Sequence, residues 1–224
     1  MPWILTASYW VLAFIYIIFA SDVTKALEPL VKILPLLFLV LWFCKGVGSA
    51  RAEERNFPSN KIRHLIVIIA LGFSMLGDVI LAVDGQHWFV YGLLAFLISH
   101  CCYIAALAPF RRLNLLLSAQ LISFYLMFAL GVLWLMAAKL GAMLLPVSCY
   151  ILIILLMSAS TWHSQKRNNW LVMGGILFIC SDAAIGLNRF YVSVQGAGVF
   201  IMLSYYAAQY ALIRGFKLAE SQTH

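Results

Sequence analysis

Long apolar runs alternate with short polar segments along the whole chain. A membrane-spanning helix needs about 20 mostly apolar residues, and eight runs approach or reach that length: residues 3–20, 29–43, 64–83, 88–108, 115–138, 142–160, 170–187 and 197–213. The pattern predicts an all-α bundle of about eight transmembrane helices. The second run is short, so its ends are expected to snorkel or the bilayer to thin locally. The fifth run is long enough to hide a break, and residues 45–63 are expected to be the longest loop.

Composition places the chain among polytopic integral membrane proteins. Of its 224 residues, 64% are hydrophobic and only 10% are charged, whereas soluble domains average about 25% charged residues. The first apolar run lacks a basic leader and an A-x-A cleavage site, so we expect it to be a retained helix. No segment is suited to a soluble domain, and we expect a single transmembrane domain over residues 1–224.

The distribution of basic residues predicts how the chain is oriented. If the N-terminus is cytoplasmic, the cytoplasmic segments hold eleven of the basic residues. The opposite side holds four, which are Lys25, Lys32, Lys139 and Arg189. Cytoplasmic loops are usually richer in Lys and Arg, so both termini are expected in the cytoplasm. The short loops favour a bacterial inner membrane, with the endoplasmic reticulum as the alternative. Scattered basic residues of this kind give no reason to expect nucleic-acid binding.

Three pairs of similar segments suggest an internal repeat. The segment around Pro35 resembles that around Pro146, the LGD of the third run resembles the CSD of the seventh, and SHCCYIAAL from Ser99 resembles SYYAAQYAL from Ser204. The matches occur in the same order and four helices apart. They favour a parallel four-plus-four repeat, an arrangement that some transporters have.

Two aspartates interrupt the apolar runs and are the first candidates for function. Asp78 lies in LGFSMLGDVILAV and Asp182 in GGILFICSDAAIGLN, in a chain with only 8 acidic residues. A charged carboxylate in a spanning helix costs about 2.5–3.5 kcal/mol on insertion scales. We expect each to lie five residues from the outer end of its helix, about 7–8 Å deep. Two such acids facing one cavity cannot both ionise easily, which suits general acid–base hydrolysis. The alternative is that each only joins helices through hydrogen bonds.

Further polar residues in or beside the predicted helices are candidates for substrate binding. Each also has a structural interpretation: Arg189 and Lys32 as snorkelling cations, His100 as a buried hydrogen-bonding residue or a proton relay, and the others as packing or interfacial residues. The candidates are Lys32, His100, Tyr103, Asn188, Arg189, Tyr205, Tyr206 and Gln209. No H-x-x-x-H or H-E-x-x-H spacing occurs, so no metal site is expected.

Several short motifs together resemble the lysoplasmalogenase (YhhN-type) membrane family over residues 29–213. They are the GD at Asp78, the F-x-x-S-H with a following Tyr, the L-L-P-V with a following Tyr, the S-D with a following N-R-F, and the Y-Y-A-A-Q run. In this chain the positions are Gly77 and Asp78; Phe96, Ser99, His100 and Tyr103; Leu144, Leu145, Pro146, Val147 and Tyr150; Ser181, Asp182, Asn188, Arg189 and Phe190; and Tyr205, Tyr206 and Gln209. One departure is that Glu28 stands directly before the first proline of the second run, where the pattern has a basic residue, and Lys32 follows one turn later.

The resemblance implies hydrolysis of the vinyl ether bond of lysoplasmalogens, giving a fatty aldehyde and glycerophosphoethanolamine or glycerophosphocholine. Asp78 and Asp182 would be the catalytic acid and carboxylate, and no cofactor or metal would be needed. The partners would be the lysophospholipid substrate and membrane lipids. The residues alone leave two alternatives open: a proton-coupled transporter of a small amphiphile, and a non-catalytic binding protein.

The charge distribution leads to a test of orientation. On a background without the five native cysteines, we expect Gln86→Cys and Ser193→Cys to be labelled by an impermeant thiol reagent in intact cells. Asn56→Cys should be labelled only after the cells are opened. Labelling at position 56 but not at 86 in intact cells would overturn the orientation.

Overall fold

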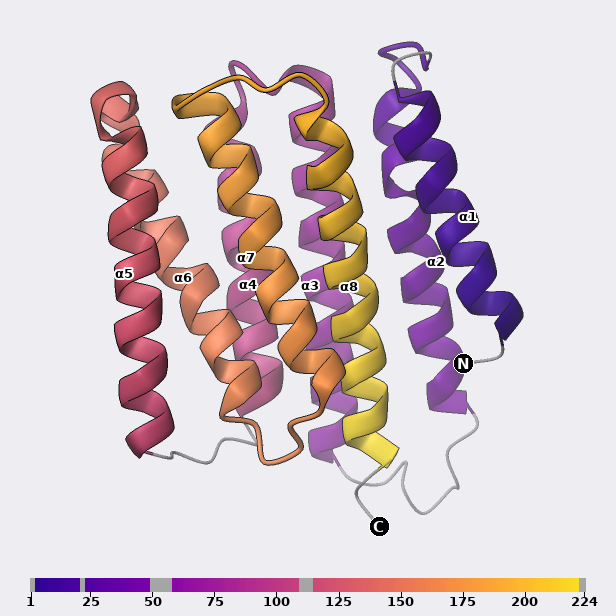
Figure 1. Ribbon diagram of the computed structural model, residues 1–224. Coiled ribbons are helices and arrows are strands. Elements are labelled where there is room, and N and C mark those ends of the chain that lie inside the picture. The colour runs from indigo at the N-terminus through magenta and orange to yellow at the C-terminus, as the bar shows by residue number, and fades with distance from the viewer. Residues whose placement is uncertain (1–2, 21–22, 49–57, 109–114, 222–224) are drawn as a thin grey trace. The chain divides into compact units, whose positions relative to one another are not determined.

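The computed structural model describes residues 3–20, 23–48, 58–108 and 115–221, and within these ranges the chain is helical without a strand (Figure 1). The helices are α1 (Trp3–Phe19), α2 (Glu28–Gly48), α3 (Pro58–Asp84), α4 (Phe89–Leu107), α5 (Leu115–Leu140), α6 (Leu144–Trp162), α7 (Asn169–Phe190) and α8 (Ala197–Ser221). A single 3-10 turn, η3 (Gly141–Met143), joins α5 to α6. The expected all-α fold with about eight helices is confirmed.

Several predicted helix ends were wrong. Helix α2 has 21 residues and reaches Gly48, so the expectation of a short second helix fails. Helix α3 begins at Pro58, and the expected loop over residues 45–63 is therefore helical at both ends; residues 49–57 lie outside the described residues. Helix α5 runs unbroken for 26 residues. Polar and basic residues at the end of a helix can continue its backbone hydrogen bonds. A hydropathy pattern, which detects only the apolar part of a helix, therefore places the helix end too early.

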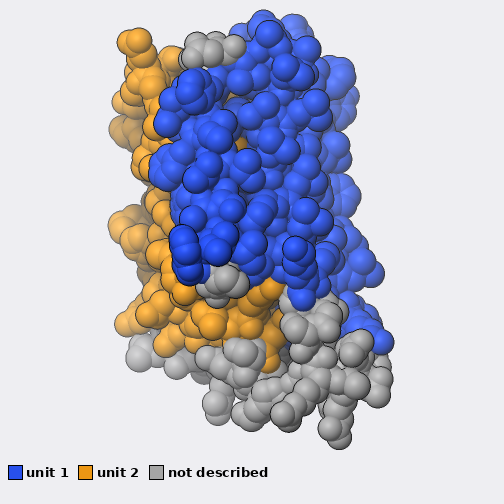
Figure 2. All heavy atoms as spheres, turned by 90° about the vertical axis from the view of Figure 1, so that its right-hand side faces the viewer, with its two compact units in different colours: residues 1–106 blue, residues 107–224 orange. Residues whose placement is uncertain are grey.

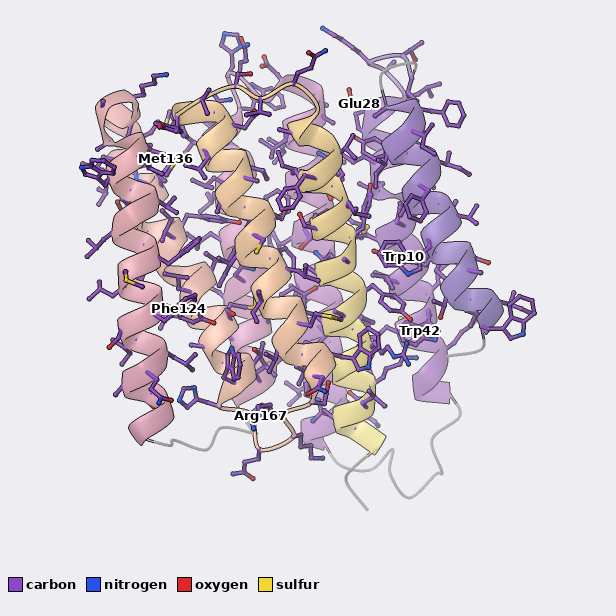
Figure 3. The ribbon with its side chains drawn as sticks, viewed as in Figure 1. Trp10, Glu28, Trp42, Phe124, Met136 and Arg167 are labelled. Atoms are coloured by element: carbon purple, nitrogen blue, oxygen red, sulfur yellow. The ribbon has the colours of Figure 1, made fainter. Side chains whose placement is uncertain are left out.

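Four helical segments of the described residues have the length and composition of membrane spans, and the chain is an integral membrane protein. One of these segments runs through α5 and α6. Backbone groups in hydrocarbon must be satisfied within the chain, which is why such spans are helical. Large apolar side chains are exposed on the helices, including Phe124 on α5 and Leu152 on α6. Figure 3 shows the side chains around the bundle, with Phe124 labelled.

The chain separates into two compact units, residues 1–106 and 107–224 (Figure 2). In the first unit, α2 packs between α1 and α3. Helices α3 and α4 also meet, since the Ser74 and Ser99 hydroxyls are 2.8 Å apart. The division falls between the fourth and fifth helices, as the proposed repeat expects, and the likeness of the two halves stays a prediction. A single transmembrane domain also stays a prediction.

In the second unit, small residues bring α7 and α8 into close contact. A Cβ on Gly174 would lie 2.7 Å from a side-chain carbon of Leu212, and one on Gly215 would lie 2.7 Å from the backbone nitrogen of Leu171. Asn168 supports the same pair of helices: its side chain accepts from the Leu171 N–H at 3.1 Å and donates to the Gly215 carbonyl at 3.0 Å. These contacts explain why glycine is used within helices whose backbones approach so closely.

The contact at Gly215 predicts a large difference between two glycine substitutions. Gly215→Ala should destabilise the protein by roughly 1–3 kcal/mol, because the new methyl group meets backbone that cannot move away. Gly131→Ala is the matched control, because no neighbouring atom lies within 4 Å of its would-be Cβ. It should be neutral or slightly stabilising, since alanine favours helix. Thermal unfolding in detergent measures both, and equal melting temperatures would contradict the packing described.

Candidate functional site

Asp78 lies deep in the first unit and faces a buried cation. Its residue is 2% exposed and that of Lys32 is 9% exposed. The Lys32 Nζ on α2 is 3.3 Å from the Asp78 Oδ1 on α3. An ammonium group this close favours the charged form of a carboxylate. The snorkelling alternative for Lys32 is wrong, because the cation meets a buried carboxylate in place of water.

The polar group around Asp78 extends to α1. Glu28 lies in the first turn of α2 (Figure 3), one turn before Lys32. The hydroxyl of Tyr16 on α1 donates to the Glu28 Oε1 at 3.4 Å. We call Tyr16, Glu28, Lys32 and Asp78 the Asp78 cluster. Although Glu28 occupies the place where the family pattern has a basic residue, the lysine one turn later reaches the candidate acid.

The motif residues beside Asp78 have packing roles. A Cβ on Gly77 would lie 2.7 Å from a ring carbon of Phe96 on α4, so glycine lets the aromatic ring lie against α3. The hydrogen bond between Ser74 and Ser99 lies one turn before Gly77 on α3. Together they fix α3 against α4 on the helix that carries Asp78. Gly77, Phe96 and Ser99 of the recognised motifs therefore support the acid and need not contact a substrate.

Asp182 lies in the second unit and has a different partner. The hydroxyl of Tyr150 on α6 donates to the Asp182 Oδ2 on α7. The sequence left open that Asp182 only joins helices through hydrogen bonds. Its neighbour Ser181 makes such a contact between α7 and α8, because the Ser181 hydroxyl donates to the Ile201 carbonyl at 3.1 Å. Asp182 itself is half-buried.

Tyr150 is the site residue that sequence reasoning missed. It was identified only as part of a motif, although its hydroxyl is the polar group that meets Asp182. The available signal was a tyrosine within an apolar run that also contains Pro146. Nothing in a single sequence, however, tells which face of that helix meets the helix carrying the acid.

The helix ends expected beyond the two acids were wrong, and a shared depth in the membrane stays a prediction. Asp78 lies six residues before the end of α3 at Asp84, about 9 Å along the axis. Asp182 lies eight residues before the end of α7 at Phe190, about 12 Å along the axis. The helices continue beyond their apolar runs, and the side chain of Asp84 stops α3 by accepting from the backbone N–H groups of Gln86 and His87 at 3.1 and 3.0 Å.

Asn188 and Arg189 lie in the last turn of α7. The Asn188 Oδ1 accepts from the Val194 N–H at 2.8 Å, so this side chain holds the segment that follows the helix. Arg189 is exposed, and its guanidinium lies 5.6 Å from the centre of the Phe190 ring. The structural alternatives fit both residues, and their proposed contact with a substrate phosphate stays a prediction.

The remaining candidates are buried on two helices. His100 and Tyr103 are fully buried and lie one turn apart on α4, in the first unit. On α8, in the second unit, the Gln209 amide donates to the Tyr205 hydroxyl at 3.4 Å, and the rings of Tyr205 and Tyr206 are 5.6 Å apart. Each unit thus brings some of the candidates together. The single cavity expected for Asp78 and Asp182, which belong to different units, stays a prediction.

No group of three or more His, Cys, Asp or Glu side chains suited to hold a metal ion occurs among the described residues. The partners found for Asp78 and Asp182 are an ammonium group and a phenol, both of which donate hydrogen bonds to a carboxylate.

Comparison with known proteins places these residues in a family. The model of the YhhN family matches residues 27–216. A Mycobacterium bovis protein named lysoplasmalogenase is 32% identical over 155 residues, which cover 67% of this chain and 59% of that protein. Human lysoplasmalogenase TMEM86A is 30% identical over 81% of the chain and 75% of its own length. Mouse lysoplasmalogenase TMEM86B is 31% identical over 95% and 83%. No solved structure was found to match.

Proposed function

Because the chain belongs to the YhhN family, we propose that it hydrolyses the vinyl ether bond of lysoplasmalogens, the reaction in the names of its relatives. The match spans only 59% of the mycobacterial relative, so the proposal needs support from this chain's own residues. That support is the pair of buried or half-buried carboxyl groups, each held by a hydrogen-bonding partner on a neighbouring helix.

The proposed reaction needs one acid and one negative charge. A carboxyl group gives its proton to the β-carbon of the vinyl ether, whose π electrons form the new C–H bond, and an oxocarbenium ion results. Water adds to this cation, loses a proton and gives a hemiacetal, which separates into a fatty aldehyde and a glycerophospho alcohol. A second carboxylate stabilises the cation or accepts the proton of water. Glycosidases divide the work between two carboxyl groups at a similar transition state.

The Asp78 cluster pairs a buried carboxyl group with a cation. Lys32 neutralises Asp78 in its resting state, and that pairing limits the cost of a buried charge. We propose that Asp78 and Asp182 are both catalytic. The other predicted polar residues, Arg189 among them, would bind the lysophospholipid, and membrane lipids would surround the exposed apolar faces.

The direct test is aldehyde release by the purified protein in detergent. Lysoplasmalogens with ethanolamine and choline head groups would be supplied, and the aldehyde measured. We expect release from both vinyl ethers and none from the matching alkyl ether, which has no π bond to protonate. Lack of aldehyde release by folded protein, together with movement of the lipid across a vesicle membrane, would favour transport over hydrolysis.

Replacing either aspartate should abolish turnover. Asp78→Asn and Asp182→Asn keep size and polarity but supply neither a suitable acid nor a negative charge, so activity should fall to less than about a tenth of wild type, a barrier increase above ~1.4 kcal/mol. Asp84→Asn is the matched control, because asparagine can still accept the backbone hydrogen bonds that end α3. A variant of Asp78 or Asp182 that folds and keeps more than this activity would show that its carboxyl group is not essential.

Removing the charge of Lys32 should weaken the enzyme at neutral pH. Lys32→Met leaves the buried Asp78 carboxyl group without its cation, so its negative charge is no longer compensated. We expect kcat/KM to fall about tenfold or more at neutral pH, with the acidic limb of the pH profile displaced upward. Lys32→Arg should restore most of the activity. Lys25→Met, which removes an exposed charge, is the control. An unchanged profile in Lys32→Met would contradict the role given to the ion pair.

A further inference from the structure

Tyr150 is a buried phenol whose one hydroxyl is directed at a candidate catalytic acid. The residue is 6% exposed. It lies in the second turn of α6, and its hydroxyl donates to the Asp182 Oδ2 on α7. Tyrosine hydroxyls inside a membrane protein need a partner. Here the partner is a carboxyl group in place of a backbone carbonyl or a serine.

The register of α6 against α7 is fixed by a second contact. A Cβ on Gly175 would lie 2.9 Å from the Ser158 Oγ and 3.1 Å from its Cα. That contact is eight residues beyond Tyr150 on α6 and seven residues before Asp182 on α7. The two contacts therefore belong to one antiparallel helix pair. The placement of the phenol against the carboxyl group is set by backbone packing two turns away.

Both helices are also tied to their other neighbours in the unit. The Tyr125 hydroxyl on α5 and the Ser158 hydroxyl on α6 are 2.8 Å apart, and the Ser181 hydroxyl holds α7 to the Ile201 carbonyl of α8. Side chains supported on several sides lose little freedom when a substrate binds, and such support gives a catalytic group a defined position.

A phenol is a suitable partner for an acid that changes its protonation state during turnover. A protonated carboxyl group still has a carbonyl oxygen that accepts the Tyr150 hydrogen bond. After the proton leaves, the same oxygen is charged and accepts the bond more strongly. An ammonium group, such as that of Lys32 beside Asp78, favours only the charged state.

We propose that Tyr150 is a positioning residue that holds Asp182 in place as the proton donor of the reaction. This inference rests on the proposed hydrolysis. The Asp182 carboxyl group gives its proton to the β-carbon of the vinyl ether, and the π electrons form the C–H bond. The Tyr150 hydroxyl keeps its own proton and stabilises the Asp182 carboxylate that results. A second carboxylate supplies the negative charge that the oxocarbenium ion needs.

Tyr150→Phe tests the inference through the pH profile. Without the hydrogen bond the charge left on Asp182 after proton transfer is less stabilised, so the plateau value of kcat/KM should fall about tenfold to a hundredfold. The alkaline limb should move to higher pH. Tyr210→Phe is the matched control, since it removes another buried hydroxyl from the same unit, and it should leave both limbs in place. A loss of activity without a displaced alkaline limb would show that Tyr150 is structural only. Displacement of the acidic limb would show that Asp182 is the carboxylate, which also overturns the inference.

Infrared spectroscopy separates this inference from the proposed function. The carbonyl band of protonated Asp182, identified by its loss in Asp182→Asn, should move to higher wavenumber in Tyr150→Phe and not in Tyr210→Phe. If the band moves but the wild-type protein releases no aldehyde, the hydrogen bond is correct and the proposed hydrolysis is wrong. If the wild type releases aldehyde but neither the band nor the alkaline limb moves, only the role of Tyr150 is overturned.

Discussion

The free-energy cost of placing a carboxyl group among apolar helices is the constraint on which the candidate site depends. A charged aspartate in a spanning helix costs about 2.5–3.5 kcal/mol on insertion scales, and an unpaired buried charge destabilises a fold further. In the structure, each of the two acids has a polar partner on a neighbouring helix. Lys32 lies 3.3 Å from Asp78, and the Tyr150 hydroxyl donates to Asp182. Each partner comes from the helix preceding the acid in the chain.

Close helix packing makes these partners possible. Gly77 admits the ring of Phe96 against α3, and Gly175 admits the backbone of Ser158 against α7. In both cases the glycine lies on the helix that carries the acid, one and seven residues before it. The two partners differ in kind: a cation favours the charged state of a carboxyl group, whereas a phenol can donate a hydrogen bond to both states. The proposed acid–base hydrolysis of a vinyl ether would use that difference.

The sequence predicted the all-helical membrane fold and the two acids because apolar periodicity and a buried charge are local signals. It did not predict the full extent of α2 or α8, whose ends are polar and still helical. It also missed the pairing of Asp182 with Tyr150 and left Lys32 open between a snorkelling and a functional role. The faces on which helices meet depend on contacts between residues far apart in the chain, such as that of Gly175 with Ser158. A single sequence does not reveal such contacts.

Isotope incorporation tests the central claim, protonation of the vinyl ether at its β-carbon, most directly. The purified protein would turn over lysoplasmalogen in D₂O and, separately, in water labelled with ¹⁸O. The aldehyde would be reduced at once to the alcohol, and the masses of both products would be measured by mass spectrometry. Carbon protonation predicts one deuterium at carbon 2 of the trapped product and a glycerophospho alcohol that keeps its original oxygen. ¹⁸O in the glycerol hydroxyl, or a trapped product without deuterium, would contradict it.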